Sequence, residues 1–336
     1  MRRRRRTCAA ALSVLAPAGL VAGCSGTANR TSATSTTTTP PPPTLTASLA
    51  PWALPAPVSR AVVLQEGPRL LVLGGLSPGD VSSPAIWSVD PSTGTSNRVG
   101  TLHLAVHDAA GAMEGSTALV FGGGSYSTVA SVQAWSPAGT VVVGQLPQAR
   151  SDLAAAVADG TVYVLGGFDG VAMTADVLAT TNGSKFTVVG QLAVPVRYPA
   201  VAAADGALWV VGGQLGTSES STVGGQSDAV QRFDPRSGHT SVVAHLPQAL
   251  GHASAFVLDG DLFVAGGRNG QAPTAQIWSI DTSTGAVRAA GALPGARSDA
   301  AVAVVGNTAF MVGGELSGPT APLDSVVELT LTRGSP

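Results

Sequence analysis

The sequence predicts an all-β fold built from six copies of one four-stranded antiparallel sheet. Six short apolar runs each end in a pair of glycines, and successive pairs are 48, 44, 46, 54 and 47 residues apart. The pairs are Gly74-Gly75, Gly122-Gly123, Gly166-Gly167, Gly212-Gly213, Gly266-Gly267 and Gly313-Gly314. A repeat of this length is typical of propeller blades. We therefore expect a six-bladed β-propeller.

The third repeat illustrates the four strands of one blade. Residues 153–158 form a small apolar run, followed by Asp159-Gly160, which suits a tight hairpin turn with positive φ. Residues 161–165 are rich in β-branched and aromatic side chains and predict a second strand. Residues 176–180 and 186–189, joined by an Asn182-Gly183 turn, supply the other two.

The two ends of the repeat region complement each other. After residues 326–331 the last repeat has no room for a fourth strand, whereas a spare segment, residues 44–52, precedes the first repeat. We expect this N-terminal segment to form the outer strand of the last blade. Such a closure leaves no long unpaired edge.

The repeats resemble those of the kelch family. The matching features are Arg150-Ser151-Asp152, the Asp159-Gly160 turn, the run 162–167 and later turns such as Asp234-Pro235. The resemblance covers about residues 44 to 332 and implies a propeller like the central domain of galactose oxidase. The tryptophan that kelch blades often carry in the fourth strand is absent, and Val or Ala stands there instead.

The N-terminal segment indicates export and lipidation. Arg2 to Arg6 precede an apolar stretch, residues 9–22, that is too short for a permanent membrane span. Val21-Ala22-Gly23-Cys24 resembles the bacterial lipobox, in which the cysteine becomes the lipidated first residue. We predict a lipoprotein signal peptide over 1–23 and attachment through Cys24 to the outer face of the bacterial cell membrane. The alternative is an ordinary signal peptide with an incidental cysteine.

The remaining chain divides into a linker and the propeller. Residues 24–43 are rich in Ser, Thr and Pro and cannot bury enough apolar area to fold, so we expect a disordered spacer. The propeller is expected over residues 44–333. Its near-neutral charge, within a chain of net charge −2, gives no basic surface for nucleic acid.

The sequence lacks the residues that several kinds of covalent, metal or catalytic site need. Cys8 and Cys24 are the only cysteines, and Cys8 leaves with the signal, so the propeller has no disulfide. A copper radical centre of the galactose oxidase type needs a cysteine and cannot form. The histidines form no metal-ligand pair motif, and no GxSxG or EF-hand pattern occurs. We expect no cofactor and no metal.

The kelch resemblance also indicates where ligands bind. In similar propellers, contacts come from a residue 14 positions before the glycine pair and from the residue just after it. The first set is Arg60, Asp108, Asp152, Tyr198, His252 and Asp299. The second set is Leu76, Gly124, Phe168, Gln214, Arg268 and Glu315. We expect all of these except Leu76 and Gly124 to bind a sugar or a peptide segment at one face.

Two functions fit these residues. The first is a non-catalytic module that binds carbohydrate or protein. The second is a sugar-active isomerase resembling N-acetylneuraminate epimerase, with Glu315, Asp152 or Asp299 as acid or base beside Arg60 or Arg268. A binder should show carboxylates paired with arginines, whereas an enzyme should show one unpaired, desolvated carboxylate. The insertion at residues 216–227 should project from the same face, as a recognition loop or as neutral drift.

Overall fold

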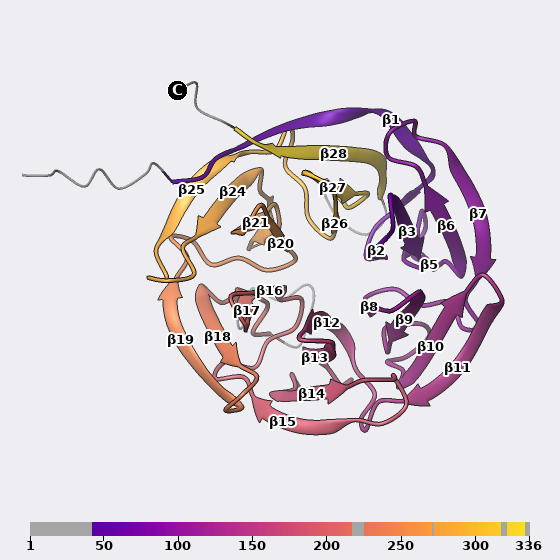
Figure 1. The fold of residues 1–336 in the computed structure, drawn as a ribbon, viewed down its shortest axis with the longest axis horizontal. Helices are drawn as coiled ribbons and strands as arrows, with labels where there is room; N and C mark the ends of the chain where they lie inside the picture. Colours follow the sequence, from indigo (N-terminus) through magenta and orange to yellow (C-terminus); the bar gives the residue numbers. More distant parts are fainter. Residues whose placement is uncertain (1–41, 217–224, 271, 317–320, 333–336) are drawn as a thin grey trace, which may run out of the picture. The chain divides into compact units, whose positions relative to one another are not determined.

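The computed structural model describes residues 42–216, 225–270, 272–316 and 321–332. In these residues, every regular element is a β-strand. Figure 1 shows the strands arranged radially around one axis, as six four-stranded antiparallel sheets. The predicted six-bladed β-propeller is confirmed.

Each blade follows the chain from the axis outwards. The first blade contains β2 (Val62–Glu66), β3 (Arg69–Leu73), β6 (Ala85–Val89) and β7 (Ser96–Thr101). The second contains β8 (Ala110–Glu114), β9 (Thr117–Phe121), β10 (Ser131–Ser136) and β11 (Gly139–Gln145). The third contains β12 (Ser151–Ala158), β13 (Thr161–Phe168), β14 (Asp176–Thr180) and β15 (Thr187–Gln191).

The other half of the ring repeats this order. The fourth blade contains β16 (Ala200–Ala204), β17 (Ala207–Val211), β18 (Ala229–Asp234) and β19 (His239–His245). The fifth contains β20 (Ser254–Leu258), β21 (Asp261–Ala265), β24 (Gln276–Ile280) and β25 (Val287–Ala292). The sixth contains β26 (Ala301–Val305), β27 (Thr308–Val312), β28 (Leu323–Leu331) and β1 (Leu45–Val58). Two short hairpins, β4 (Leu76–Ser77) with β5 (Val81–Ser82) and β22 (Arg268–Asn269) with β23 (Ala272–Pro273), complete the list.

The N-terminal strand closes the ring. β1 pairs antiparallel with β28, and Leu45 lies opposite Leu331 while Leu49 lies opposite Val327. Figure 1 shows β1 along the outside of the sixth blade. Leu45 is buried in one cluster with Phe263 of the fifth blade and Leu329 of the sixth. The expected completion of the last blade by the start of the propeller is therefore confirmed.

Apolar side chains from neighbouring blades form the core. Trp87, Trp135 and Trp278, on third strands, each pack against the preceding blade, as expected for residues between sheets. Trp135, for example, shares a cluster with Leu71 and Leu73 of the first blade. This packing provides the aromatic contacts between blades that the fourth strands lack.

In the second and fourth blades, glutamine occupies the position that Trp87 and Trp278 hold, and in the second blade Trp135 lies two residues after it. Gln133 and Gln231 lie opposite the same second-strand position that Trp87 and Trp278 face in their own blades. The buried Gln133 amide accepts from Leu104 N–H at 2.8 Å and donates to the Leu104 carbonyl at 3.0 Å. Since both polar ends are satisfied, the amide joins two segments of chain without the penalty of an unpaired buried group.

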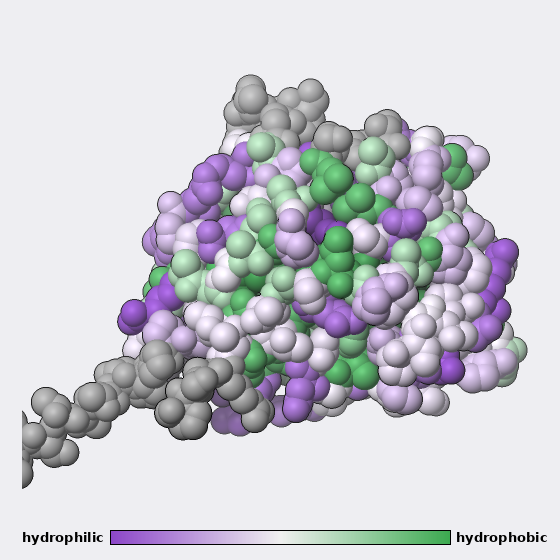
Figure 2. Space-filling model, turned by 90° about the horizontal axis from the view of Figure 1, so that it is seen from above, coloured by the Kyte–Doolittle hydropathy of each residue, from purple (hydrophilic) through white to green (hydrophobic). Residues whose placement is uncertain are grey.

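The outer strands of the described residues carry some exposed apolar side chains. They expose several valines, among them Val99, Val141 and Val188. On the side shown in Figure 2, apolar and polar side chains are mixed across the described surface. No helix in the described residues is long and apolar enough to cross a membrane.

The glycine pairs allow two backbones to approach each other. Gly75 has φ 95°, and its N–H donates to the Val106 carbonyl in the segment leading to the second blade, at 2.9 Å. A Cβ at Gly75 would lie 2.7 Å from the Ser59 carbonyl oxygen and 2.6 Å from Val58. A side chain is therefore excluded by space as well as by backbone conformation.

We expect Gly75→Ala to lower the free energy of unfolding by about 3 kcal/mol, because it combines a left-handed backbone with a steric clash. Gly79→Ala is the matched control: its φ is 82°, but no atom lies within 4 Å of the added Cβ. That change should cost about 1 kcal/mol. Urea denaturation of both variants measures the difference. Equal losses of stability in the two variants would show that the close approach of the two backbones does not require glycine at position 75.

Candidate functional site

The first predicted set forms a closed ring around the axis. All six residues have positive φ, between 52° and 59°. Each N–H donates to the carbonyl of its counterpart in the preceding blade, at 2.8 to 3.2 Å. The members are Arg60, Asp108, Asp152, Tyr198, His252 and Asp299. Positive φ is costly for such residues and is concentrated at functional sites.

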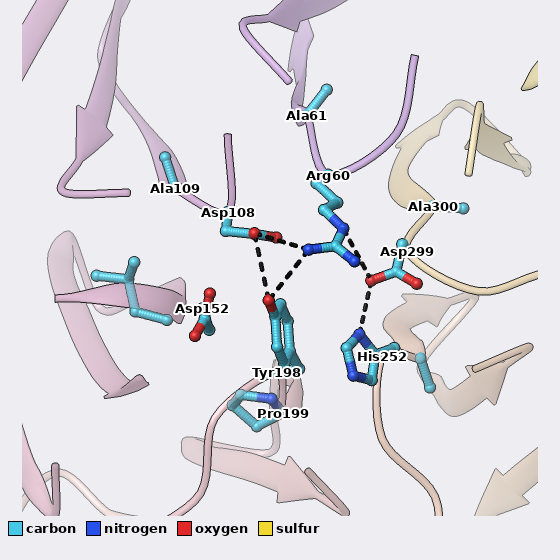
Figure 3. A pocket seen from close by; sticks show the side chains of 12 residues that line it. Arg60, Ala61, Asp108, Ala109, Asp152, Tyr198, Pro199, His252, Asp299 and Ala300 are labelled. Atoms are coloured by element: carbon cyan, nitrogen blue, oxygen red, sulfur yellow. Dashed lines mark hydrogen bonds and ion pairs between the residues drawn. The ribbon is translucent and has the colours of Figure 1, made fainter. Parts of the chain in front are cut away.

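Arg60 connects several blades through its guanidinium. Its Nη1 lies 3.2 Å from both the Asp108 carboxylate and the Tyr198 hydroxyl, and its Nε lies 3.1 Å from Glu315. Arg60 belongs to the first blade and Tyr198 to the fourth, so this contact crosses the axis (Figure 3). The Tyr198 hydroxyl lies 3.3 Å from the same Asp108 oxygen.

His252 and Arg268 extend the network on the other side of the ring. His252 Nδ1 lies 2.6 Å from Asp299 and Nε2 lies 3.1 Å from the Gln214 side-chain oxygen. Both ring nitrogens therefore have a polar partner. Arg268 donates to Asp299 at 3.2 Å and to Glu315 at 2.6 Å. Each of these carboxylates therefore faces more than one basic group.

Burial and charge move the pKa values of the two acids in opposite directions. Burial alone would raise the pKa of Asp299, but the charge and hydrogen bond of His252, with Arg60 and Arg268, hold it well below its usual value. Burial raises the pKa of Glu315, and the neighbouring Asp299 charge raises it further. Arg60 and Arg268 only partly offset this effect.

The sequence did not predict Arg197, which joins the network next to Tyr198. Its Nη2 lies 2.5 Å from Asp152, and its guanidinium lies 4.7 Å from the Phe168 ring centre and 4.9 Å from that of Tyr198. Tyr198 in turn stacks on His252 at 3.9 Å. The residue before the ring position varies between blades, so the repeat pattern gave no signal for Arg197.

Two buried arginines hold the backbone segments that lead into ring residues. Arg297 donates to the Gly313 carbonyl at 2.7 Å and to the Ser325 carbonyl at 2.9 Å, and burial lowers its pKa to about 10. Arg150 makes similar bonds to the carbonyls of Gly166 and Asp176. They lie two residues before Asp299 and Asp152, so they help to fix the backbone that carries these carboxylates.

All ten predicted residues therefore belong to one network, with Phe168 attached through Arg197. Its charged side chains are only 0 to 12% exposed, so they form a mostly buried cluster and not an open rim. Leu76 and Gly124, at the remaining two positions, supply no polar side chain. A Cβ at Gly124 would lie 2.8 Å from the His107 ring.

The ring residues border a cavity of about 110 Å³, together with the residues that follow them in the chain. Among the described residues, no group of three or more His, Cys, Asp or Glu could hold a metal ion. At the base of the insertion, the Gln226 amide pairs with the backbone of Gly270, which follows β22 within the hairpin that carries Arg268. Residues 217–224 and Cys24 lie outside the described part of the chain.

We expect Asp299→Asn to lower the free energy of unfolding by about 3 kcal/mol at pH 7, because it removes the negative partner of three buried basic groups. The folded pKa of Asp299 is depressed, so its stabilising contribution is present above the unfolded pKa of about 4 and is lost as pH falls below it. Urea denaturation from pH 3 to 8 tests both points. A variant as stable as the parent at pH 7 would contradict the assignment.

Glu315 should show the opposite pH dependence. Because its folded pKa is raised, its contribution is fully present below the unfolded pKa and is lost as pH rises through the folded value. Glu315→Gln should remove this loss of stability at higher pH. At pH 7 it should lower the free energy of unfolding by less than Asp299→Asn does. The same denaturation series checks the ranking, and the reverse order would show that Glu315 is the more strongly stabilised anion.

Comparisons with known proteins agree with this fold. The Kelch motif family matches residues 249–292, which include the fifth blade. A solved structure entitled "Structure of YjhT" superimposes with a TM-score of 0.69 at 16% identity, covering 84% of this chain and 99% of that chain. A search of curated proteins finds no match. The chain is thus a six-bladed β-propeller that carries the Kelch motif.

Proposed function

We propose that this propeller is a non-catalytic module that binds carbohydrate or protein ligands. The observation that carries the proposal is that the carboxylates of the network are paired with basic groups. Asp108 lies 3.2 Å from Arg60, Asp152 2.5 Å from Arg197 and Glu315 2.6 Å from Arg268. A general acid or base must exchange a proton with its substrate, and paired carboxylates are poorly suited to that role.

The loops that follow the glycine pairs supply the contact surface in this proposal. They expose apolar side chains from four blades: Val81, Tyr126, Val171 and Leu316. Tyrosine is favoured at binding surfaces, and the three aliphatic side chains add exposed apolar area that a ligand can cover. Arg268, 12% exposed, is the most accessible of the network's guanidiniums that form ion pairs with carboxylates. A ligand on this face would meet an apolar rim and Arg268.

One observation favours the sugar-active isomerase. The pKa of Glu315 is raised, as expected for a carboxylic acid that donates a proton. Its side chain is fully buried and bonded to two arginines, however, so a sugar cannot reach it without rearrangement of the network. Binding without catalysis therefore explains the geometry better.

We propose further that the propeller is anchored to the outer face of the bacterial cell membrane through Cys24. The lipobox-like tetrad and the basic start of the chain support this localisation. A lipoprotein anchor carries more than one acyl chain, which makes attachment stable.

A screen of glycans, peptidoglycan fragments and peptides tests the binding function. For any ligand found, Arg268→Ala and Tyr126→Ala should each weaken binding at least tenfold, equivalent to about 1.4 kcal/mol. Arg288→Ala, on the exposed side of β25, is the matched control and should have no effect. If all three variants bind equally well, the ligand does not use this face.

The anchor has its own test. Cys24→Ser should move the protein from the membrane fraction to the soluble fraction and abolish incorporation of labelled fatty acid. Cys8→Ser provides the control, because Cys8 lies within the predicted signal peptide. Membrane attachment that survives Cys24→Ser would exclude lipidation at this residue.

A further inference from the structure

The exposed apolar side chains of the loops that follow the glycine pairs lie on one half of the ring. Leu316, Val81, Tyr126 and Val171 belong to the sixth, first, second and third blades, which are neighbours around the axis (Figure 1). We call these four residues the apolar arc. In the fourth and fifth blades, the described residues of the same loops expose no large apolar side chain. The two halves of this face therefore differ in character.

The third-blade loop holds its apolar tip in a fixed position. Val171 is 81% exposed, yet its N–H and that of Ala172 both donate to the Asp169 carboxylate at 2.7 Å. The other oxygen of this carboxylate accepts from the Gln148 amide at 2.6 Å. The loop is thus ordered by its own hydrogen bonds while its valine stands in water.

The hairpin that carries Val81 is fixed as well. β4 pairs with β5, with Ser77 opposite Val81. The Ser82 hydroxyl lies 2.8 Å from Nδ1 of His107, in the segment that leads into the second blade. Because such loops are ordered before a ligand arrives, little conformational entropy is lost when their tips are covered. Covering an apolar side chain that stands in water is itself favourable.

The loops of the apolar arc carry acidic side chains and no basic ones. Between their glycine pairs and the next strands, the sequence contains neither lysine nor arginine. Asp80 is exposed next to Val81, and Asp169 lies two residues before Val171. Hydrogen bonds from the N–H groups of Ala172 and Val171 lower the pKa of Asp169, so it is an anion at neutral pH. A positively charged partner complements these loops.

Arg268 lies beside the sixth-blade end of the apolar arc. It donates at 2.6 Å to Glu315, the residue before Leu316, and its side chain is 12% exposed. Its bonds to Asp299 and Glu315 use Nε and Nη2. Nη1 can donate to a carbonyl of a chain that lies on the arc, and a peptide offers such an acceptor at every residue.

We propose that the apolar arc docks a segment of another protein that carries large apolar side chains together with lysine or arginine. This inference rests on the binding function proposed above and names the class of its ligand. Three of the four arc residues are aliphatic and have no hydrogen-bonding group, so hydroxyls of a sugar pressed against them would lose their bonds to water. Apolar side chains of a protein segment have no such cost, and its cations face Asp80 and Asp169.

Fluorescence anisotropy with labelled synthetic peptides tests the proposal on the intact protein. The probe contains leucine, lysine and glycine. One comparison peptide has glutamate in place of lysine, and the other has serine in place of leucine. We expect the probe to bind at least tenfold more tightly than either, because the arc supplies both apolar area and negative charge. Its affinity should fall as salt is added, since exposed charges are screened.

Variants of the arc locate the binding. Val81→Ser combined with Val171→Ser should weaken binding of the probe at least tenfold, because apolar contacts are lost in two blades. Val141→Ser combined with Val188→Ser is the matched control, since these outer-strand valines are 59% and 52% exposed, and it should bind the probe like the parent. Asp80→Asn should weaken binding and its salt dependence, and asparagine accepts the φ of 59° at this position. Circular dichroism should show all variants folded.

Several results would overturn the proposal: no binding of the probe, equal binding of the glutamate peptide, or binding that survives the Val81 and Val171 changes. If a glycan binds and loses affinity with Arg268→Ala while the probe does not bind, the binding function stands and the apolar arc is not a protein-docking surface. If neither glycans nor peptides bind, both proposals fail.

Discussion

The closed ring of six backbone hydrogen bonds is the constraint on which the rest of the site depends. Each bond joins equivalent residues of adjacent blades, so the six sheets are tied at one level close to the axis. The bonds require a left-handed backbone at six residues that are not glycine. The cost of these conformations is offset by blade packing and by the bonds themselves.

This ring also explains why so much charge lies in the interior. Six side chains that start at one narrow level are forced together, and four of the six ring positions carry Asp or Arg. Charges brought so close are tolerated only when they compensate one another. Arg60, Arg197, Arg268 and His252 provide that compensation for Asp108, Asp152, Asp299 and Glu315. The network therefore acts as a polar crosslink between blades.

Sequence was sufficient to predict features that follow from spacing. The strand lengths and hairpin turns between a ring residue and its glycine pair are nearly constant, so Arg60 and His252 could be assigned to equivalent positions. The joining of residues 44–52 to the last blade followed from a missing strand and a spare one. Arg197 and the paired amides of Gln133 and Gln231 could not be predicted, because they depend on side chains that reach a neighbouring segment of chain. The low solvent exposure of the network side chains could not be predicted either, since polar residues at loop positions usually face solvent.

The pairing of β1 with β28 has a consequence for how the protein is made. Leu45 and Leu331 lie at opposite ends of the propeller sequence, so their contact has one of the largest possible separations along the chain. Contacts of this kind form late and slow the overall reaction. A ribosome must release nearly the entire polypeptide before the circle can be completed. Until then the sixth sheet lacks its outermost strand, and the outer edge of β28 stays unpaired.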